Sequence, residues 1–382
     1  MKFVFASDSF KGSLSSRQII SLLEQEARRI FPGCETVGLP MADGGEGTMD
    51  ALLEALQGSR ETLIVQNPRF QPISASYGLL PQGGAIIEMA QASGLPLLPK
   101  EQQDPEQTTT FGTGELIAHA LKKGCRDLYL AIGGSATNDG GMGALCALGA
   151  VFLDKDNQPL PGIGASLGKV HRIDLSGLLP QIRETRFHVL CDVNNPLLGP
   201  SGASTVFAPQ KGADEQAVQR LEKGMDHYAK ITTQTLGKDC SLLPGAGAAG
   251  GLGFALLAFL GAELSSGVET VLRLLDFDHI LQGTDWVITG EGRMDSQSPR
   301  GKVISGVVKH CAKAQVPTMA IVGSLGDGYE SLLQQGLTGV ITTVNRCMAL
   351  DEAFSQAETL YSDAAFRVFS MIKNLPGYKG KV

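Results

Sequence analysis

The residues best suited to chemistry gather in one short segment, 290–302, which reads GEGRMDSQSPRGK. It carries five charged side chains: Glu291, Arg293, Asp295, Arg300 and Lys302. The segment directly follows an apolar, strand-like run, so we expect these side chains to line a cleft rather than plain surface. Guanidinium and ammonium groups bind phosphate or carboxylate oxygens, and carboxylates suit Mg²⁺. The pattern indicates a site for a small anionic ligand.

Loops of similar composition follow the other strand-like runs. Six segments at strand ends contain glycine, a carboxylate, or both: 7–13, 40–48, 133–141, 192–199, 290–297 and 323–328. Any single one could be an ordinary turn, because Gly, Asp, Asn and Ser favour turns. Ligands of open α/β sheets bind outside the carboxyl ends of the strands. The set as a whole therefore favours convergence on one or two clefts.

Segment 244–253, PGAGAAGGLG, has the G-x-G-x-x-G spacing of dinucleotide-binding loops at three glycines: Gly245, Gly247 and Gly250. That fingerprint needs a strong strand before it and an acidic residue at the end of a second strand. Here the lead-in is only 241–243, and Glu263 follows a helix-like run, which disfavours an NAD site. Two interpretations stay open: a phosphate cradle at a helix N-terminus, and close backbone packing. Segment 133–141, GGSATNDGG, has the same form.

Other features narrow the class of protein. The sequence has no Walker A motif, no H-R-D or D-F-G element of protein kinases, no H-E-x-x-H and no G-x-S-x-G. Its seven cysteines are scattered without a C-x-x-C pair, which is typical of reduced thiols in a cytoplasmic protein. A net charge of −7 disfavours nucleic acid and anionic membranes as partners. The uncharged run 245–262 is strongly apolar only from residue 252, which indicates a buried helix rather than a membrane span.

Apolar, β-rich runs alternate with helical patterns over almost the whole chain of 382 residues. This alternation predicts α/β layers with largely parallel strands. Around 73–89 the strands instead alternate like an antiparallel pair. We therefore expect two α/β domains with the active-site cleft between them. Residues 1–66 plus 282–382 would form a Rossmann-like domain with a mostly parallel sheet, and 67–281 an inserted domain with a mixed sheet.

Eight motifs, taken together, resemble those of the first type of bacterial glycerate kinase. They are DSFKGSLS at 8–15, PMADGGEGT at 40–48, FGTGEL at 111–116, IGGSATNDGG at 132–141, CDVNNPLLGPSGA at 191–203, FAPQKGA at 207–213, GAGAAGGLG at 245–253 and ITGEGRMDSQ at 288–297. They occur in the same order and span essentially the whole chain. Ser298 stands where a threonine is expected, a departure that removes no charge.

The resemblance implies an enzyme that transfers the γ-phosphoryl group of ATP to D-glycerate with Mg²⁺. The product would be 2-phosphoglycerate rather than 3-phosphoglycerate, formed in glyoxylate, glycolate or sugar-acid breakdown. The reaction requires positioning, charge neutralisation and a group that takes the hydroxyl proton. D-glycerate would be the small-molecule partner, and the oligomeric state stays open between monomer and homodimer.

Our hypotheses for the site residues follow from this chemistry. Asp192 is the candidate base, and Lys11 and Arg293 are the other catalytic candidates. The candidates for substrate binding are Asp8, Ser9, Lys11, Asp43, Asn194, Lys211 and Arg293. The candidates for binding nucleotide phosphates are Gly133, Gly134, Ser135, Thr137, Gly245, Gly247, Gly250 and Gly251. The candidates for holding Mg²⁺ are Asp295, Asp43 and Glu46.

Two other functions stay open from the sequence. One is a kinase for another small hydroxy acid, such as a longer sugar acid. The other is a non-catalytic protein that binds a small anion. The carboxylates and basic residues at strand ends disfavour the second, because binding alone rarely needs paired acids.

Overall fold

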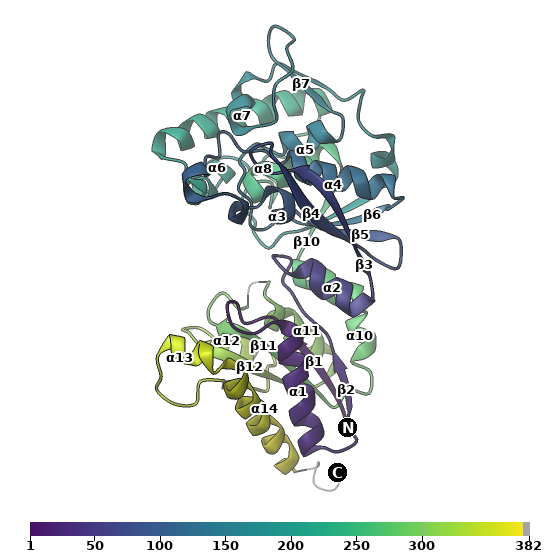
Figure 1. Cartoon of the computed structure of the whole chain (residues 1–382), viewed down its shortest axis with the longest axis vertical. Coiled ribbons are helices and arrows are strands. Elements are labelled where there is room, and N and C mark those ends of the chain that lie inside the picture. The colour runs from purple at the N-terminus through teal and green to yellow at the C-terminus, as the bar shows by residue number, and fades with distance from the viewer. Residues whose placement is uncertain (300, 377–382) are drawn as a thin grey trace. The chain divides into compact units, whose positions relative to one another are not determined.

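The chain forms two compact units, which we name by their place in the sequence. The computed structural model describes residues 1–299 and 301–376. The terminal unit consists of Met1–Asp43 and Gly267–Val382, and the inserted unit is Gly44–Ser266. In Figure 1 the terminal unit combines the purple start of the chain with its green and yellow end.

The domain boundaries lie elsewhere than at the expected 66/67 and 281/282. β3 (Ser59–Gln66) pairs along its whole length with β4 (Pro72–Leu79), and α2 (Thr48–Leu56) packs on β4. Residues 44–66 therefore belong to the inserted unit. At the other end, α9 (Gly267–Leu274) packs on α11 (Val303–Ala314), which makes it part of the terminal unit.

The terminal unit is built on a five-stranded sheet in the order β13-β12-β11-β1-β2, and every pair in it is parallel. Its elements are β1 (Lys2–Ser7), α1 (Ser16–Ile30), β2 (Glu35–Gly38), α9, α10 (Phe277–Ile280), β11 (Trp286–Met294), α11, β12 (Thr318–Leu325), α12 (Glu330–Gln334), β13 (Gly339–Thr342), α13 (Leu350–Ser355) and α14 (Ala357–Asn374). Helix α1 begins at a capping box: Ser15 accepts a hydrogen bond from the Gln18 amide, and the Gln18 side chain accepts one from the Ser15 amide.

Helices cover both faces of this parallel sheet. One core joins side chains of β1 and β11 with α1 and α14, which lie side by side (Figure 1). Ile321 of β12 belongs to this core, whereas its neighbours Ala320 and Val322 pack with α11 in a second core. Successive strand residues point to opposite faces, so α1 and α11 cover opposite faces of the sheet.

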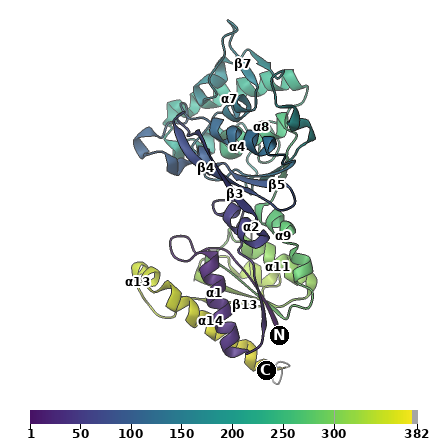
Figure 2. The same cartoon turned by 45° about the vertical axis from the view of Figure 1, so that its right-hand side comes forward.

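The inserted unit is built on a six-stranded mixed sheet in the order β10-β9-β6-β5-β4-β3. Its elements are α2, β3, β4, β5 (Gly84–Glu88), α3 (Ala90–Ser93), α4 (Phe111–Lys122), β6 (Asp127–Ala131), α5 (Met142–Ala147), β7 (Val151–Leu153), β8 (Arg172–Asp174), β9 (Arg186–Leu190), α6 (Ala203–Phe207), α7 (Glu215–Leu236), α8 (Ala248–Phe259) and β10 (Glu263–Ser265), together with short 3₁₀ turns. β3, β4 and β5 run antiparallel, and β5, β6, β9 and β10 are parallel. β3 and β4 form a long hairpin (Figure 2).

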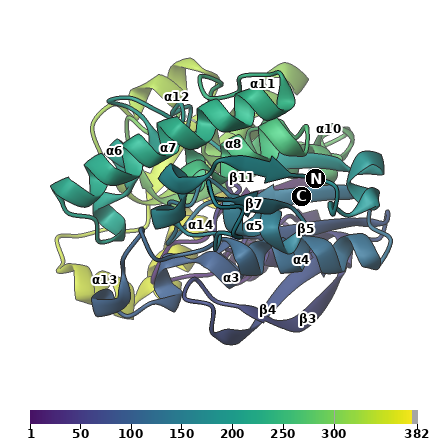
Figure 3. The ribbon, with the colours of Figure 1, turned by 90° about the horizontal axis from the view of Figure 1, so that it is seen from above.

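One large core holds the inserted unit together. It joins alternate residues of the sheet, such as Leu128, Leu130, Phe187 and Val189, with apolar side chains of α4, α5, α7 and α8. α4 and α5 pack against each other, as the view from above shows (Figure 3). The expected fold class is confirmed: two α/β units, one with a parallel sheet and one with a mixed sheet inserted in the first. Among the described residues, no helix is both long and apolar enough to cross a membrane.

Candidate active site

The parallel sheet of the terminal unit has a topological switch point between β1 and β11. These strands are neighbours, and the helices that follow them, α1 and α11, cover opposite faces. A crevice forms at such a point because the two connections leave the sheet edge in opposite directions. A pocket of about 500 Å³ lies there, lined by residues that follow or end β1, β11, β12 and β13.

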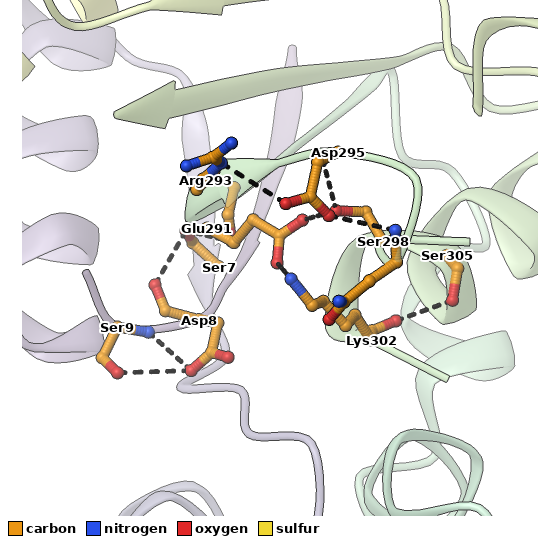
Figure 4. A network of polar contacts seen from close by, with 11 residues as sticks. Ser7, Asp8, Ser9, Glu291, Arg293, Asp295, Ser298, Lys302 and Ser305 are labelled. Atoms are coloured by element: carbon orange, nitrogen blue, oxygen red, sulfur yellow. Dashed lines mark hydrogen bonds and ion pairs between the residues drawn. The ribbon is translucent and has the colours of Figure 1, made fainter. Parts of the chain in front are cut away.

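The polar lining of this pocket unites several residues predicted from the sequence. Asp8, Ser9, Lys11, Asp43 and Arg293 all line it, and Glu291 and Lys302 join them. Figure 4 shows how Asp8, from the end of β1, and Glu291, from the end of β11, lie near one another. From the sequence, the Glu291 carboxylate suits Mg²⁺ and the Lys302 ammonium suits an anion, although neither residue is among the candidates named for a specific role.

The surroundings of Asp8 raise the pKa of its carboxyl group well above the usual value. One oxygen, Oδ1, accepts a hydrogen bond of 2.6 Å from the Ser9 amide. Burial and the negative charge of Asp43, with a smaller effect of Glu291, raise the pKa of Asp8 to about 7, against the opposing effects of the Ser9 amide and Lys11. A carboxyl group with a pKa near neutrality can take and return a proton at physiological pH.

Glu291 is buried, with 6% of its surface exposed, and has two side-chain partners. Its Oε2 lies 3.1 Å from the Lys302 ammonium, and its Oε1 accepts a hydrogen bond from the Ser298 hydroxyl. Burial raises the pKa of Glu291, although Ser298 and Lys302 both stabilise the charged form. The serine at 298 thus supplies the hydroxyl that the expected threonine would supply. Figure 4 shows the carboxylate between its two partners.

Arg293 and Asp295 form an ion pair at the end of β11, with 3.4 Å between Nε and Oδ2 (Figure 4). The other Asp295 oxygen accepts a hydrogen bond from the Gln297 amide and so holds the turn that follows the strand. Arg300, the remaining charged residue of this segment, lies outside the described residues.

Lys211 lies in the inserted unit and is buried, with 2% of its surface exposed. Its Nζ donates hydrogen bonds of 2.7 Å to the Ser135 hydroxyl and to the Thr137 carbonyl oxygen. Burial lowers the pKa of Lys211 to about 7, although the nearby charge of Asp139 opposes the change. The structure therefore brings Lys211 together with the 133–141 loop of the same unit.

Asp139 explains how the 133–141 loop is held. Its carboxylate accepts hydrogen bonds from the Thr110 amide and hydroxyl and from the amides of Gly141 and Gly143. Gly133 and Gly134 begin this loop, and the Gly134 carbonyl accepts a hydrogen bond from the Leu95 amide. These bonds fix the loop within the inserted unit.

The glycines of segment 245–253 permit close backbone packing. Gly250 has φ +64°, and a Cβ atom there would lie 2.0 Å from the Thr137 carbonyl oxygen. A Cβ atom at Gly247 would lie 2.2 Å from the Pro196 carbonyl oxygen. Gly245 and Gly251 also have positive φ, at +79° and +88°. Three loops that follow β6, β9 and α7 thus meet in the inserted unit, which supports close backbone packing, and the binding of nucleotide phosphates by these glycines stays a prediction.

Three other predicted residues lie on the surface of the inserted unit. Asp192 and Asn194 are exposed in the loop after β9, and Glu46 is exposed in the loop before α2. Asp192, the predicted base, and Glu46, a predicted metal ligand, thus belong to the inserted unit, whereas Asp8 and Asp43 line the pocket of the terminal unit. In the described part of the chain, no group of three or more His, Cys, Asp and Glu side chains is arranged to hold a metal ion.

A doubly wound parallel sheet with charged side chains at its switch point, and a mixed α/β unit inserted in the chain, define a two-unit α/β protein with a charged pocket. The glycerate kinase family profile matches residues 3–373, and the chain belongs to this family. It is accordingly a kinase that phosphorylates an alcohol group. The resemblance drawn from the sequence motifs is confirmed.

Individual relatives are similar to this chain over nearly its full length. A protein of Halalkalibacterium halodurans named glycerate kinase is 45% identical over 363 residues, covering 95% of this chain and 96% of its own. A protein of Escherichia coli strain K12 named glycerate 2-kinase is 46% identical over 358 residues, covering 94% of both. A crystal structure assigned as glycerate kinase 2 from Salmonella typhimurium LT2 superposes with a TM-score of 0.89, at 42% identity and 98% coverage of both chains.

Proposed function

We propose that this chain transfers the γ-phosphoryl group of ATP to D-glycerate, giving 2-phosphoglycerate and ADP. The relatives named glycerate kinase support the acceptor, and the relative named glycerate 2-kinase supports position 2. The reaction would take place in the cytoplasm, in the breakdown of glyoxylate, glycolate or sugar acids.

The pocket at the switch point is the observation that carries this proposal. Phosphoryl transfer requires positive charge around the transferring group and a base for the acceptor hydroxyl. The pocket supplies three basic side chains, Lys11, Arg293 and Lys302, beside carboxylates that include Asp8. These cations share the pocket with the carboxylates of Asp8, Asp43 and Glu291.

We assign the proton-accepting role to Asp8 rather than to Asp192. A general base works best when its pKa is close to the working pH, and the pKa of Asp8 is raised to about 7. Lys11 and Arg293 would bind the glycerate carboxylate and the transferring phosphoryl group, and Ser9 would donate a hydrogen bond to the acceptor. Lys211, Asn194 and the glycines of the inserted unit would shape loops rather than react.

Mg²⁺ fits the carboxylates of this pocket. Asp43 lies close enough to Asp8 for its charge to raise the pKa of Asp8. One or two carboxylates are what Mg²⁺ takes together with substrate phosphates. Of the predicted ligands, Asp43 lines the pocket and would hold the ion, and Asp295 would act next to it through Arg293. When bound, the ion neutralises charge on the nucleotide phosphates.

The proposal is tested by measuring ADP release from ATP and Mg²⁺ with and without D-glycerate, followed by phosphorus NMR of the product. We expect turnover only with D-glycerate, its loss when the metal is chelated, and a doublet from phosphate on the single-proton carbon 2. A triplet would indicate carbon 3. A folded protein that releases no ADP from ATP with D-glycerate, but does so with another hydroxy acid, would overturn the choice of acceptor.

A further inference from the structure

The pocket of the terminal unit has an apolar side that the acceptor does not explain. Leu350, Ala353, Phe354 and Ala357 line it from α13 and the start of α14, and Phe10 and Val344 join them. D-glycerate has three carbon atoms, each bonded to oxygen, so it offers no apolar surface to cover these side chains. Part of this pocket is therefore shaped for a different group.

Helix α13 has an unusual balance of contacts. Its apolar residues Leu350, Ala353 and Phe354 lie at i, i+3 and i+4, the spacing of a face that helices in globular proteins normally bury. All residues of α13 are described, and none of them is buried. Leu350 remains 67% exposed and Phe354 47% exposed. An ion pair of 2.6 Å between Arg346 and Glu352 holds the polar side of the helix.

The apolar stripe and the charged residues follow strands of the same sheet, at the edge where the parallel strands end. β13, which leads to α13, is three strands from β1, which leads to Asp8, and neighbouring strands are about 4.8 Å apart. The edge therefore runs from charged groups at β1 and β11 to apolar groups after β13. A ligand that fills this pocket has an anionic end and a flat apolar end.

We propose that the apolar stripe of α13, with Phe354 at its centre, binds the purine base of the nucleotide, while its phosphates lie toward Lys11 and Arg293. This assignment rests on the proposed function, because it takes the ligand to be a nucleoside triphosphate. It places the base in the terminal unit, not on the glycine loops of the inserted unit. Aromatic and aliphatic side chains bind bases by stacking, and each base contributes enough for a clear loss on substitution with alanine.

The test uses full-length variants and ADP binding measured by calorimetry without any acceptor. Phe354→Ala should raise the Kd of ADP and the KM of ATP about tenfold, and leave the KM of D-glycerate within about twofold. Phe354→Trp should restore ADP binding. The matched control is Phe366→Ala on α14: Phe366 is 40% exposed, contacts Arg29, and is not among the described residues that line the pocket. It should leave the Kd of ADP unchanged.

Pyrophosphate, which carries phosphates but no base, separates the two ends of the site. Its Kd should be the same for Phe354→Ala and the unchanged chain. An unchanged Kd of ADP in both Phe354→Ala and Leu350→Ala, or an effect confined to the KM of D-glycerate, would overturn the proposal. ADP binding is measured without any acceptor. The test of the base site therefore stays valid even if the acceptor is not D-glycerate.

Discussion

At the scale of single residues, the environment of a carboxylate decides its chemistry. Asp8 and Asp192 both follow an apolar strand, and the sequence suggests Asp192 as the base and Asp8 as a substrate-binding residue. Asp8 is half-buried in a pocket of the terminal unit with two other carboxylates, and Asp192 is an exposed residue of the inserted unit. Burial and neighbouring negative charge disfavour the ionised form, and both act on Asp8.

Asp8→Asn should lower kcat by about 10²–10⁴-fold, the usual contribution of a general base. It should also raise Tm, because it removes a buried carboxylate that is repelled by Asp43 and Glu291. Steady-state kinetics and thermal unfolding of the same preparation check both effects. A larger loss of kcat in Asp192→Asn would return the base role to Asp192.

The same group predicts how activity and stability depend on pH. In the unchanged enzyme kcat/KM should rise as pH increases through about 7, because Asp8 becomes a base on losing its proton. The folded pKa lies above the usual 3.8, so the folded state binds the extra proton between these values. The contribution of Asp8 to the free energy of unfolding therefore falls as pH rises across that window, and Asp8→Asn should abolish this fall in urea titrations.

For Lys211 we expect the opposite pH dependence of the free energy of unfolding. Its folded pKa is about 7 against the usual 10.5, so between these values the unfolded chain holds a proton that the folded chain lacks. The free energy of unfolding should therefore rise with pH across this window. Lys211→Met should lose this rise in denaturant titrations at pH 7 and 10. Lys122→Met, at an exposed position of α4, should keep it; a loss in both variants would contradict the assignment.

At the scale of elements, ion pairs join helices α9, α10 and α11 of the terminal unit. His310 of α11 lies 2.6 Å from Asp278 of α10 and 3.0 Å from Glu269 of α9. Although burial lowers the pKa of His310, the hydrogen bonds and charges of both carboxylates raise it overall. Two neighbouring lysines also face this group: Lys309 pairs with Glu269, and Lys313 faces Asp278. One imidazolium thus joins three helices of the terminal unit.

His310→Gln should lower the free energy of unfolding by roughly 1 kcal/mol at pH 6 and by less at pH 9, since solvent screens ion pairs near the surface. The folded pKa lies above 6.5, so the stabilisation is fully present below that value and is lost as pH rises through the folded pKa. Urea unfolding at both pH values measures the difference. An equal loss at pH 6 and pH 9 would mean that packing, not charge, joins these helices.

At the scale of the whole molecule, each unit has cores of its own. The large cluster around Phe187 lies within the inserted unit, and the clusters around Phe5 and Val308 lie within the terminal unit. Cooperative unfolding follows contiguous packing. The two units are therefore expected to unfold as separable steps.

Phe187→Ala should destabilise the inserted unit by about 3–5 kcal/mol, because it leaves a cavity where the side chain is 2% exposed. Differential scanning calorimetry should show one unfolding transition shifted to lower temperature and the other unchanged. A uniform shift of the entire unfolding profile would indicate that the two units unfold as one.

The sequence by itself determined the alternation of strands and helices, the two-unit α/β class and the family. These features rest on local signals: apolar periodicity, strand-end loops and long motifs in a fixed order. It also determined that segment 290–302 carries reactive charges, and Arg293 and Glu291 do line the pocket. Elements of three residues, such as β10, escaped notice because so few positions establish no period.

Only the tertiary structure decided which strand ends meet. Asp8, Asp43 and Arg293 share one pocket because β1, β2 and β11 are parallel and adjacent, and strand order is a non-local property that loop composition does not encode. The same holds for the glycines of 245–253, whose partners are the carbonyl oxygens of distant loops. The unit boundaries at 43/44 and 266/267 likewise depend on where β3 and α9 pack, since pairing and packing, not chain position, assign an element to a core.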